Sequence, residues 1–301
     1  MTDCPLVSVV TASYNMGEFL RETIDSVLSQ DYPHIEYIVM DGGSTDGTLE
    51  VLEGYRGRII FHSAPDGGAA DAINRGMELA RGSIIAYLHA DDTYLPGAVS
   101  EVVRQFVEHP TTDIVYGEGY WVDVKGAILR RYPTRPFDRA VLARECFICQ
   151  PASFMRRSTF EIAGGLDASL QYTFDFDFWI RASPWAEFRH IDAYLATSRM
   201  HPRNKTVGQR REVLRETLRL LKMRYGYVPF SWIHAYCCYR IDGRDQFYQA
   251  LRPSLLKYLV SLPVGLHHNT DRPLRYILEW ADAISWGGFV RLCKRAVRFG
   301  G

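Results

Sequence analysis

The fold is indicated most clearly by the stretch Gly82-Ser-Ile-Ile-Ala-Tyr-Leu-His-Ala-Asp-Asp-Thr-Tyr-Leu-Pro96, in which an apolar run meets two adjacent carboxylates, Asp91 and Asp92. Residues 84–88 are too few for a helix and are β-branched, aromatic or aliphatic, which is typical of a strand covered on both faces. The carboxylates then follow the strand at its carboxyl end, where open α/β sheets bind ligands. Paired carboxylates are hard ligands for a divalent cation that also holds phosphates. The alternative is a turn that caps the next helix, with Pro96 near its first turn.

Length and composition favour a large globular protein. The chain has 301 residues, of which 47% are hydrophobic, so either one large domain or two domains can form a core. The six cysteines show no disulfide-like spacing, which fits a reducing compartment, and the lone pair Cys146 and Cys149 is expected to be buried thiols. We find neither a signal peptide nor an apolar run of about 18 residues, so we expect a cytoplasmic protein.

The charges are distributed unevenly along the chain. Residues 1–202 contain 17 Lys and Arg against 28 Asp and Glu, whereas residues 203–301 contain 18 against 7. The acidic part suits ligands bridged by a metal ion, and the basic, aromatic-rich part suits an anionic surface. A nucleic-acid partner is not expected, because the sequence has no recognised reading motif.

Strands and helices alternate through the first 120 residues. Apolar segments at 7–12, 35–40, 59–62, 84–88 and 113–116 predict strands, and residues with helical spacing lie between them. This alternation predicts a mostly parallel sheet with right-handed crossovers. The pattern then changes to an expected hairpin around Lys125 and Gly126, followed by two short strands between Glu187 and Met200, so the second half of the sheet should be mixed.

Two further segments carry candidate ligands. Asp41 follows the second predicted strand and could accept hydrogen bonds from a base or a ribose, while the Gly42-Gly43 turn lets the backbone approach a ligand closely. Asp71 and Asn74 lie at i and i+3 in the first turn of a predicted helix, where a ribose and diphosphate could be met. For Asp71 the simpler alternative is that it complements the helix dipole.

The order of these features resembles the family 2 glycosyltransferases with the GT-A fold. The resemblance covers about residues 5–208 and rests on an ordered set of motifs: Val9-Val-Thr-Ala-Ser-Tyr-Asn15, Tyr37-Ile-Val-Met-Asp-Gly-Gly-Ser-Thr-Asp-Gly47, Asp71-Ala-Ile-Asn-Arg-Gly76, His89-Ala-Asp-Asp92, and Gly164-Gly-Leu-Asp167 followed by Asp175-Phe-Asp-Phe-Trp-Ile-Arg181. It implies an α/β fold with a Rossmann-like, mostly parallel central sheet, a mixed acceptor-side half and a helical C-terminal extension.

The resemblance also implies a role for each matched residue. Asp41 would contact the base, Asp91 the ribose, and Asp92 a Mn²⁺ or Mg²⁺ ion that bridges the diphosphate. The expected donor-binding residues are Thr11, Ser13, Tyr14, Asn15, Asp41, Gly42, Asp71, Asn74 and Asp91. Two departures are evident, because His89 stands where many relatives carry the first Asp of a DxD motif and Phe174 replaces an acid that often precedes the base.

The resemblance makes Asp175 the general base that deprotonates the acceptor hydroxyl, with Asp177 as the alternative. If this segment begins a helix, two residues separated by one position point in different directions, so only one of them can face the sugar. Trp179 could stack on the acceptor sugar, although a core tryptophan is an equal alternative. His201 is the candidate second metal ligand, because a histidine at this place in relatives can complete the metal shell.

The predicted organisation is a catalytic domain at 1–206 and a helical, basic extension at 207–301. Residues 1–118 would bind the nucleotide-sugar donor, and residues 119–206 would bind the acceptor. The basic extension, with its Trp and Phe residues, suits peripheral contact with an anionic membrane on the cytosolic face. The alternatives are a helical cap or a homodimer interface.

The sequence therefore predicts an inverting, metal-assisted glycosyltransferase that moves a sugar from a UDP- or dTDP-sugar to a glycan or lipid-linked acceptor. A nucleotidyltransferase is one alternative, but it would need a basic phosphate-binding loop after the first strand, and residues 13–17 contain no Lys or Arg. A non-catalytic protein that binds nucleotide sugars is the other, and Asp175 argues against it.

Overall fold

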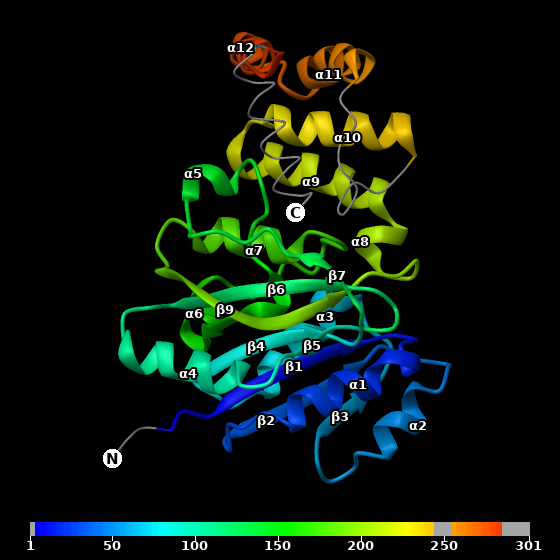
Figure 1. Cartoon of the computed structure of the whole chain (residues 1–301), viewed down its shortest axis with the longest axis vertical. Coiled ribbons are helices and arrows are strands. Elements are labelled where there is room, and N and C mark those ends of the chain that lie inside the picture. Colours follow the sequence, from blue (N-terminus) through cyan, green and yellow to red (C-terminus); the bar gives the residue numbers. More distant parts are fainter. Residues whose placement is uncertain (1–3, 244–253, 285–301) are drawn as a thin grey trace. The chain divides into compact units, whose positions relative to one another are not determined.

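The computed structural model of the chain describes residues 4–243 and 254–284 (Figure 1). The chain divides into two compact units, Met1–Phe137 with Ile148–Met200, and Asp138–Phe147 with His201–Gly301. The sequence-based boundary at residue 206 falls inside the second unit. The sequence also gave no sign that the short segment Asp138–Phe147 belongs with the C-terminal residues.

The first unit is built on one mixed sheet. Its strands run in the order β3-β2-β1-β4-β8-β6-β9-β5, and β7 pairs with β6 outside this path. The strand bounds are β1 Val7–Ser13, β2 Ile35–Asp41, β3 Ile60–Ser63, β4 Ile84–His89, β5 Thr93–Tyr94, β6 Ile114–Val122, β7 Ile128–Arg131, β8 Ser153–Arg156 and β9 Phe188–Arg199. All seven residues of β1 are buried, as expected for a strand covered on both faces.

The pairing of the strands confirms most of the predicted sheet. Strands β1 to β4 run parallel to one another, whereas β8 is antiparallel to β4 and β6 forms an antiparallel hairpin with β7. The prediction of two short strands between Glu187 and Met200 is wrong, because β9 is one strand of twelve residues. It pairs in parallel with β6 across register shifts near Glu118, and such bulges let one long strand bend without ending.

Helices cover the sheet of the first unit. Their bounds are α1 Gly17–Leu28, α2 Thr48–Glu53, α3 Ala69–Leu79, α4 Ala98–Glu108, α6 Arg157–Ile162 and α7 Phe174–Ala182, with a 3₁₀ turn η1 at Gln150–Ala152. A Cβ on Gly76 of α3 would lie 2.4 Å from Cγ1 of Val10. This glycine therefore allows α3 to pack closely against β1.

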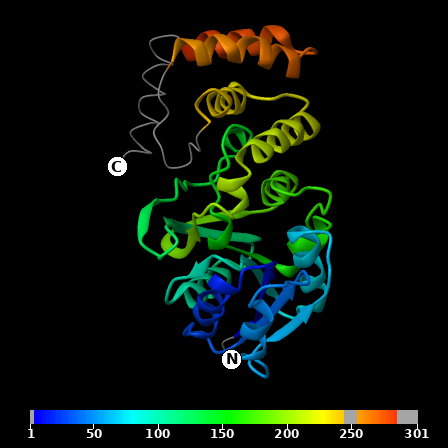
Figure 2. The same cartoon turned by 90° about the vertical axis from the view of Figure 1, so that its right-hand side faces the viewer.

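The described part of the second unit is helical. It contains α5 Arg139–Leu142, α8 Lys205–Gly208, α9 Arg210–Tyr225, α10 Phe230–Asp242, α11 Leu255–His268 and α12 Pro273–Ile284. Helices α11 and α12 lie side by side (Figures 1 and 2). Within residues 4–243 and 254–284, none of the helices combines the length and apolar composition that a bilayer crossing requires. Of the two cysteines expected to be buried, Cys149 is buried, whereas Cys146 is half-buried.

A buried carboxylate joins three segments at the amino ends of the parallel strands. Glu36 of β2 accepts hydrogen bonds from Ser8 Oγ of β1 (2.6 Å) and from the backbone N–H (2.7 Å) and Nε (2.7 Å) of Arg81, which precedes β4. Burial opposes ionisation of Glu36, but the hydrogen bonds from Ser8 and Arg81 outweigh it and lower its pKa. This cluster lies at the edge of the sheet opposite to Asp91 and Asp92.

We expect the Glu36→Gln substitution to lower the free energy of unfolding at pH 7 by about 1–3 kcal/mol, because it removes hydrogen bonds to a buried charge. A lowered pKa in the folded state contributes stability above the unfolded pKa, and this contribution is lost as the pH falls through the folded pKa. The difference between variant and wild type in urea unfolding should therefore shrink below about pH 4. The exposed Glu53→Gln serves as control and should shift the midpoint far less; an equal shift would contradict the role of Glu36.

Candidate active site

The candidate active site lies at the carboxyl ends of neighbouring parallel strands. In the register of the sheet, Ser13 at the end of β1 is opposite Asp41 at the end of β2, and Ala12 is opposite His89 at the end of β4. The loops that follow these strands therefore meet at one edge, which is the usual ligand-binding edge of an open α/β sheet.

The loops after β1 and β2 are tied together through Asn15. The Asn15 backbone N–H donates to Ser44 Oγ at 2.7 Å, and its side-chain Oδ1 accepts from the Thr45 N–H at 2.8 Å. Asn15 has a positive φ of 53°, a conformation that asparagine tolerates better than most residues. The neighbouring Tyr14 side chain is 60% exposed, so this fixed loop presents an aromatic ring to solvent.

Asp41 organises the loop that follows β2. Its buried carboxylate accepts hydrogen bonds from the backbone N–H groups of Gly43 (3.2 Å) and Ser44 (3.0 Å) and from the hydroxyl groups of Ser44 and Ser63, the latter at 2.6 Å. Four donors from the protein thus fix this side chain before any ligand arrives.

A pocket of about 230 Å³ adjoins Asp41. Its lining also contains Asp66 and Arg75, two charged side chains that the sequence analysis did not assign to the site. A Cβ on Gly42 would lie 2.8 Å from Asp66 Oδ2, so a larger residue at this position would push the Asp66 carboxylate aside. Asp66 could have been identified from its position in the sequence, because it comes shortly after a parallel strand, β3, as Asp41 and Asp91 do.

Three of the residues expected to bind the nucleotide-sugar donor, namely Thr11, Asp71 and Asn74, interact with other residues of the protein. Thr11 is fully buried, and its hydroxyl shares a hydrogen bond of 2.9 Å with that of Tyr37. Asp71 forms an ion pair with Arg75 at 2.7 Å. Asn74 exchanges hydrogen bonds of 2.8 and 2.9 Å with the backbone of Leu166, which joins α3 to the loop before α7.

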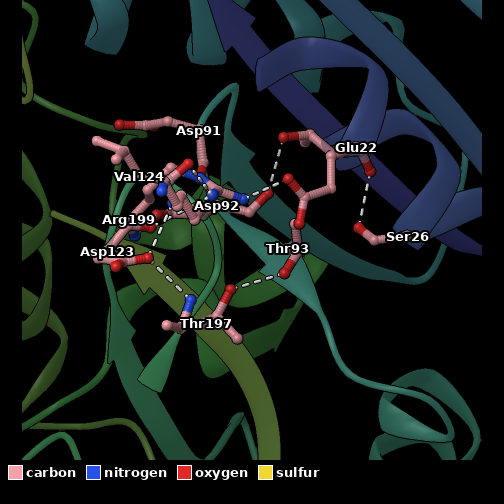
Figure 3. A network of polar contacts seen from close by, with 12 residues as sticks. Glu22, Ser26, Asp91, Asp92, Thr93, Asp123, Val124, Thr197 and Arg199 are labelled. Atoms are coloured by element: carbon pink, nitrogen blue, oxygen red, sulfur yellow. Dashed lines mark hydrogen bonds and ion pairs between the residues drawn. The ribbon is translucent and has the colours of Figure 1, made fainter. Parts of the chain in front are cut away.

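Asp91 and Asp92 form a buried acidic turn after β4 (Figure 3). Thr23 of α1 donates from Oγ1 to the carbonyl oxygens of Ala90 (2.9 Å) and Asp92 (2.8 Å), and the Arg199 backbone N–H donates to Asp92 Oδ1 at 2.9 Å. Burial, and after it the charge of Asp91, raises the pKa of Asp92 well above its usual range. A bound cation would relieve both effects.

The first turn of α7 lies next to the end of β4. The Phe174 ring contacts the ring of His89, with centroids 6.0 Å apart, and it also packs near Tyr87. His89 therefore takes part in an aromatic cluster, and Phe174 brings the following residue, Asp175, toward the strand that ends in the acidic turn.

The structure distinguishes the two aspartates of α7. Asp177 is fully buried and pairs with Arg181 at 2.7 Å, and the Arg181 guanidinium also donates to the carbonyl oxygens of Ala163 and Gly165. Asp175 is only partly buried, and its Oδ1 accepts from the Phe176 N–H at 2.7 Å. Asp177 thus fixes the loop before α7, while Asp175 keeps access to solvent.

Trp179 lies in the core of the first unit. It is 0% exposed and packs edge-on against Phe178 and Phe188, at centroid distances of 5.2 and 6.3 Å. A sugar could not reach its ring without displacing these neighbours, which favours the alternative that Trp179 is a core residue. His201 is the first residue of the second unit, where it is buried and its carbonyl oxygen accepts from the Asn204 N–H at 3.0 Å.

The acidic turn fits a metal ion that the substrate helps to bind. Among the described residues, no group of three or more His, Cys, Asp and Glu side chains is arranged to hold a metal. Mg²⁺ is commonly bound by one or two carboxylates together with substrate phosphates and water, so two aspartates are a sufficient contribution from the protein. The donor set therefore suits Mg²⁺ or Mn²⁺ bound together with a diphosphate.

Comparison with known sequences gives consistent results. The sequence profile described as "Glycosyl transferase family 2" matches residues 8–162, just over half of the chain. A PGL/p-HBAD biosynthesis glycosyltransferase of Mycobacterium bovis is 32% identical over 200 residues, which cover 64% of this chain and 76% of the relative. The chondroitin synthase of Pasteurella multocida is 28% identical over 207 residues, which cover 67% of this chain but 21% of that longer protein.

Solved structures with the GT-A fold resemble the chain over most of its length. Residues 1–349 of S. aureus TarS in complex with UDP-GlcNAc match with a TM-score of 0.60 at 15% identity, covering 89% of this chain and 82% of that one. The mannosyltransferase PcManGT from Pyrobaculum calidifontis, in complex with GDP-Man and Mn²⁺, matches with a TM-score of 0.59 at 17% identity, covering 98% and 86%. These likenesses confirm the predicted fold class.

Proposed function

Because the chain belongs to glycosyl transferase family 2, and is therefore a glycosyltransferase with a nucleotide-sugar donor, we propose that it acts by inversion on a glycan or lipid-linked acceptor. The observation that carries this proposal is the buried acidic turn at the end of β4, flanked by the Asp41 loop on one side and by Asp175 of α7 on the other. Base, diphosphate and acceptor would each meet a carboxylate.

We propose a UDP- or dTDP-sugar as the donor. The pyrimidine would bind at the pocket beside Asp41, where Asp41, Asp66 and Arg75 offer it acceptors and a cation. Asp91 would bind the ribose, and the remaining loop contacts would come from Ser13, Tyr14, Asn15, Gly42 and Asp71. Thr11 and Asn74 would act indirectly, by holding Tyr37 and Leu166.

Asp92 is the proposed protein ligand of Mn²⁺ or Mg²⁺, and His201 stays a proposal as a second one. When bound, the cation stabilises the negative charge that develops on the diphosphate as the bond to the sugar breaks. Asp91 and Asp92 contribute two buried carboxylates whose mutual repulsion favours binding of a cation over solvation by water.

Asp175 is the proposed general base. It would accept the proton of the acceptor hydroxyl while the hydroxyl oxygen attacks the anomeric carbon from the face opposite the diphosphate. The new glycosidic bond forms as the bond to the diphosphate breaks, so a single displacement inverts the anomeric centre. The ion pair of Asp177 with Arg181 explains why we assign this role to Asp175.

Membrane contact is a further part of the proposal, because a lipid-linked acceptor would lie at the bilayer surface. The prediction rested on the basic extension at 207–301, of which residues 244–253 and 285–301 lie outside the described residues. Among the described residues, α11 has three exposed leucines, Leu255, Leu256 and Leu259. Helix α12 has two more, Leu274 and Leu278, and each of these two is at least 71% exposed. Adjacent helices with exposed leucines are suited to insertion at a membrane interface.

The Asp92→Asn substitution should remove most of the dependence of nucleotide binding on Mn²⁺. In calorimetry, we expect the wild type to bind UDP more tightly when Mn²⁺ is present. With Mn²⁺ present, the variant should bind UDP at least about tenfold more weakly than the wild type, because residue 92 would then be a weaker ligand to the cation. Asp31→Asn, at an exposed carboxylate of the opposite edge, should bind as the wild type does. Equal Mn²⁺ dependence in Asp92→Asn and wild type would disprove the metal assignment.

The two aspartates of α7 should respond differently to amidation. Asp175→Asn should keep its melting temperature and its affinity for UDP but lose transfer by about 10²-fold or more, since general-base catalysis contributes about 10²–10⁴-fold. Asp177→Asn should instead lower the melting temperature, because it takes the anion away from the partly buried Arg181. If transfer is lost only in a fully folded Asp177→Asn, the base is Asp177.

Exposed leucines of the second unit should determine vesicle binding. In co-sedimentation, the double variant Leu259→Ser with Leu278→Ser should bind phosphatidylglycerol vesicles at least about tenfold more weakly. Each substitution removes apolar surface that the leucine would bury in the membrane. The control, Leu129→Ser with Ile162→Ser, removes two exposed apolar side chains of the first unit and should bind normally. Unchanged binding of the first variant would exclude this surface, and a change in its oligomeric mass would identify a dimer interface instead.

A further inference from the structure

Arg199 connects three segments of the first unit beneath the acidic turn. It ends β9 and is only 1% exposed. Its Nε donates to the carbonyl oxygen of Asp91 at 3.0 Å, its Nη1 donates to that of Val124 at 3.0 Å, and its Nη2 pairs with Glu22 of α1 at 2.5 Å (Figure 3). One guanidinium thus joins α1, the turn after β4 and the turn between β6 and β7.

The same residue also fixes the side chain of Asp92. The Arg199 backbone N–H donates to Asp92 Oδ1 at 2.9 Å, so Arg199 reaches one aspartate through its main chain and the other through its side chain. The short strand β5 sets this register, because Thr93 pairs with Thr197 and their hydroxyl groups are 2.6 Å apart (Figure 3). The end of β9 is therefore held in place against the acidic turn.

This arrangement opposes the natural tendency of the turn to open. Two adjacent carboxylates repel each other and would be better solvated if they turned outward. The guanidinium holds the carbonyl oxygen of Asp91 from beneath, and being always protonated it places a permanent positive charge there. Its planar set of donors can serve several acceptors in different directions, which a lysine ammonium does less well.

We propose that Arg199 is a positioning residue for metal and diphosphate binding, which keeps Asp91 and Asp92 buried and oriented before the donor arrives. The proposal rests on the proposed function of the acidic turn. Residues that orient metal ligands affect affinity strongly, and their loss commonly weakens metal binding by about 10–100-fold. Arg199 would touch neither the donor nor the acceptor.

The chain offers a matched control in Arg156. Its Nε donates to the carbonyl oxygen of Thr112, its Nη2 donates to those of Phe106 and Pro110, and its guanidinium lies 5.1 Å from the centre of the Phe106 ring. The Arg199 guanidinium lies at the same distance from the ring of Phe19. Arg156 pairs with Ile84 at the start of β4, so it likewise bonds to backbone carbonyl oxygens, but at the end of the strand remote from the acidic turn.

The test compares Arg199→Lys with Arg156→Lys. The readouts are the melting temperature and the affinity for Mn²⁺ in the presence of UDP, measured from the free Mn²⁺ signal in electron paramagnetic resonance. We expect both variants to lose some thermal stability, but only Arg199→Lys to bind Mn²⁺ at least about tenfold more weakly. Arg199→Ala should regain part of this affinity when guanidinium is added at millimolar concentration, and Arg156→Ala should show no such gain.

A second variant keeps the proposal testable if the changes at Arg199 prevent folding. Glu22 is the charged partner of Arg199, and its side chain is 58% exposed, so Glu22→Ala should fold. It should weaken Mn²⁺ binding by about threefold or more, because one anchor of the guanidinium is lost. Unchanged Mn²⁺ affinity in this variant would overturn the positioning role.

The outcomes separate this inference from the proposed function. If the wild type binds Mn²⁺ with UDP, and Arg199→Lys and Arg156→Lys bind as tightly as it does, Arg199 is only a structural residue and the proposed function stands. Equal weakening in both variants would overturn the role of Arg199 in the same way. If the wild type shows no coupled binding of Mn²⁺ with UDP, dTDP or GDP, the proposed function fails and the role of Arg199 falls with it.

Discussion

The burial of two adjacent carboxylates is the constraint on which the rest of this site depends. Asp91 and Asp92 stand at the end of a strand that is covered on both faces, and their repulsion must be balanced by groups from elsewhere in the chain. The Thr23 hydroxyl group shares its proton between two carbonyl oxygens of the turn, and Arg199 supplies one hydrogen bond to each aspartate. These contacts hold the turn in place, and under the proposed function this would reduce the rearrangement that binding of the donor and a cation requires.

The two edges of the parallel strands serve different purposes. At the amino ends, the buried carboxylate of Glu36 accepts hydrogen bonds from Ser8 and Arg81 and so links neighbouring segments of the sheet. At the carboxyl ends, Asp41 and the acidic turn face loops and a pocket. The sheet therefore separates residues that stabilise the fold from residues that would bind the donor, as is common in folds of this class.

The sequence predicted the features that are local and missed those that depend on distant contacts. Short apolar runs followed by Asp identified β2 and β4 and the aspartates at their ends, because a strand and the residue after it are read together. Arg199 could not be assigned, since its partner Glu22 lies 177 residues away and an arginine at a strand end has no distinctive pattern. Thr23 could not be assigned either, since its hydroxyl group contacts backbone carbonyl oxygens 67 and 69 residues away. Trp179 was ambiguous because an aromatic residue follows the same pattern in a core and at a sugar-binding surface.

A crystal structure of the protein with Mn²⁺ and UDP tests the central claim most directly, because anomalous scattering locates the metal independently of the model of the protein. We expect Mn²⁺ bound to Asp92 and to the diphosphate, the uracil in the pocket beside Asp41, and Arg199 still bonded to the carbonyl oxygen of Asp91. Mn²⁺ bound away from the acidic turn, or UDP bound elsewhere with the turn unoccupied, would contradict it.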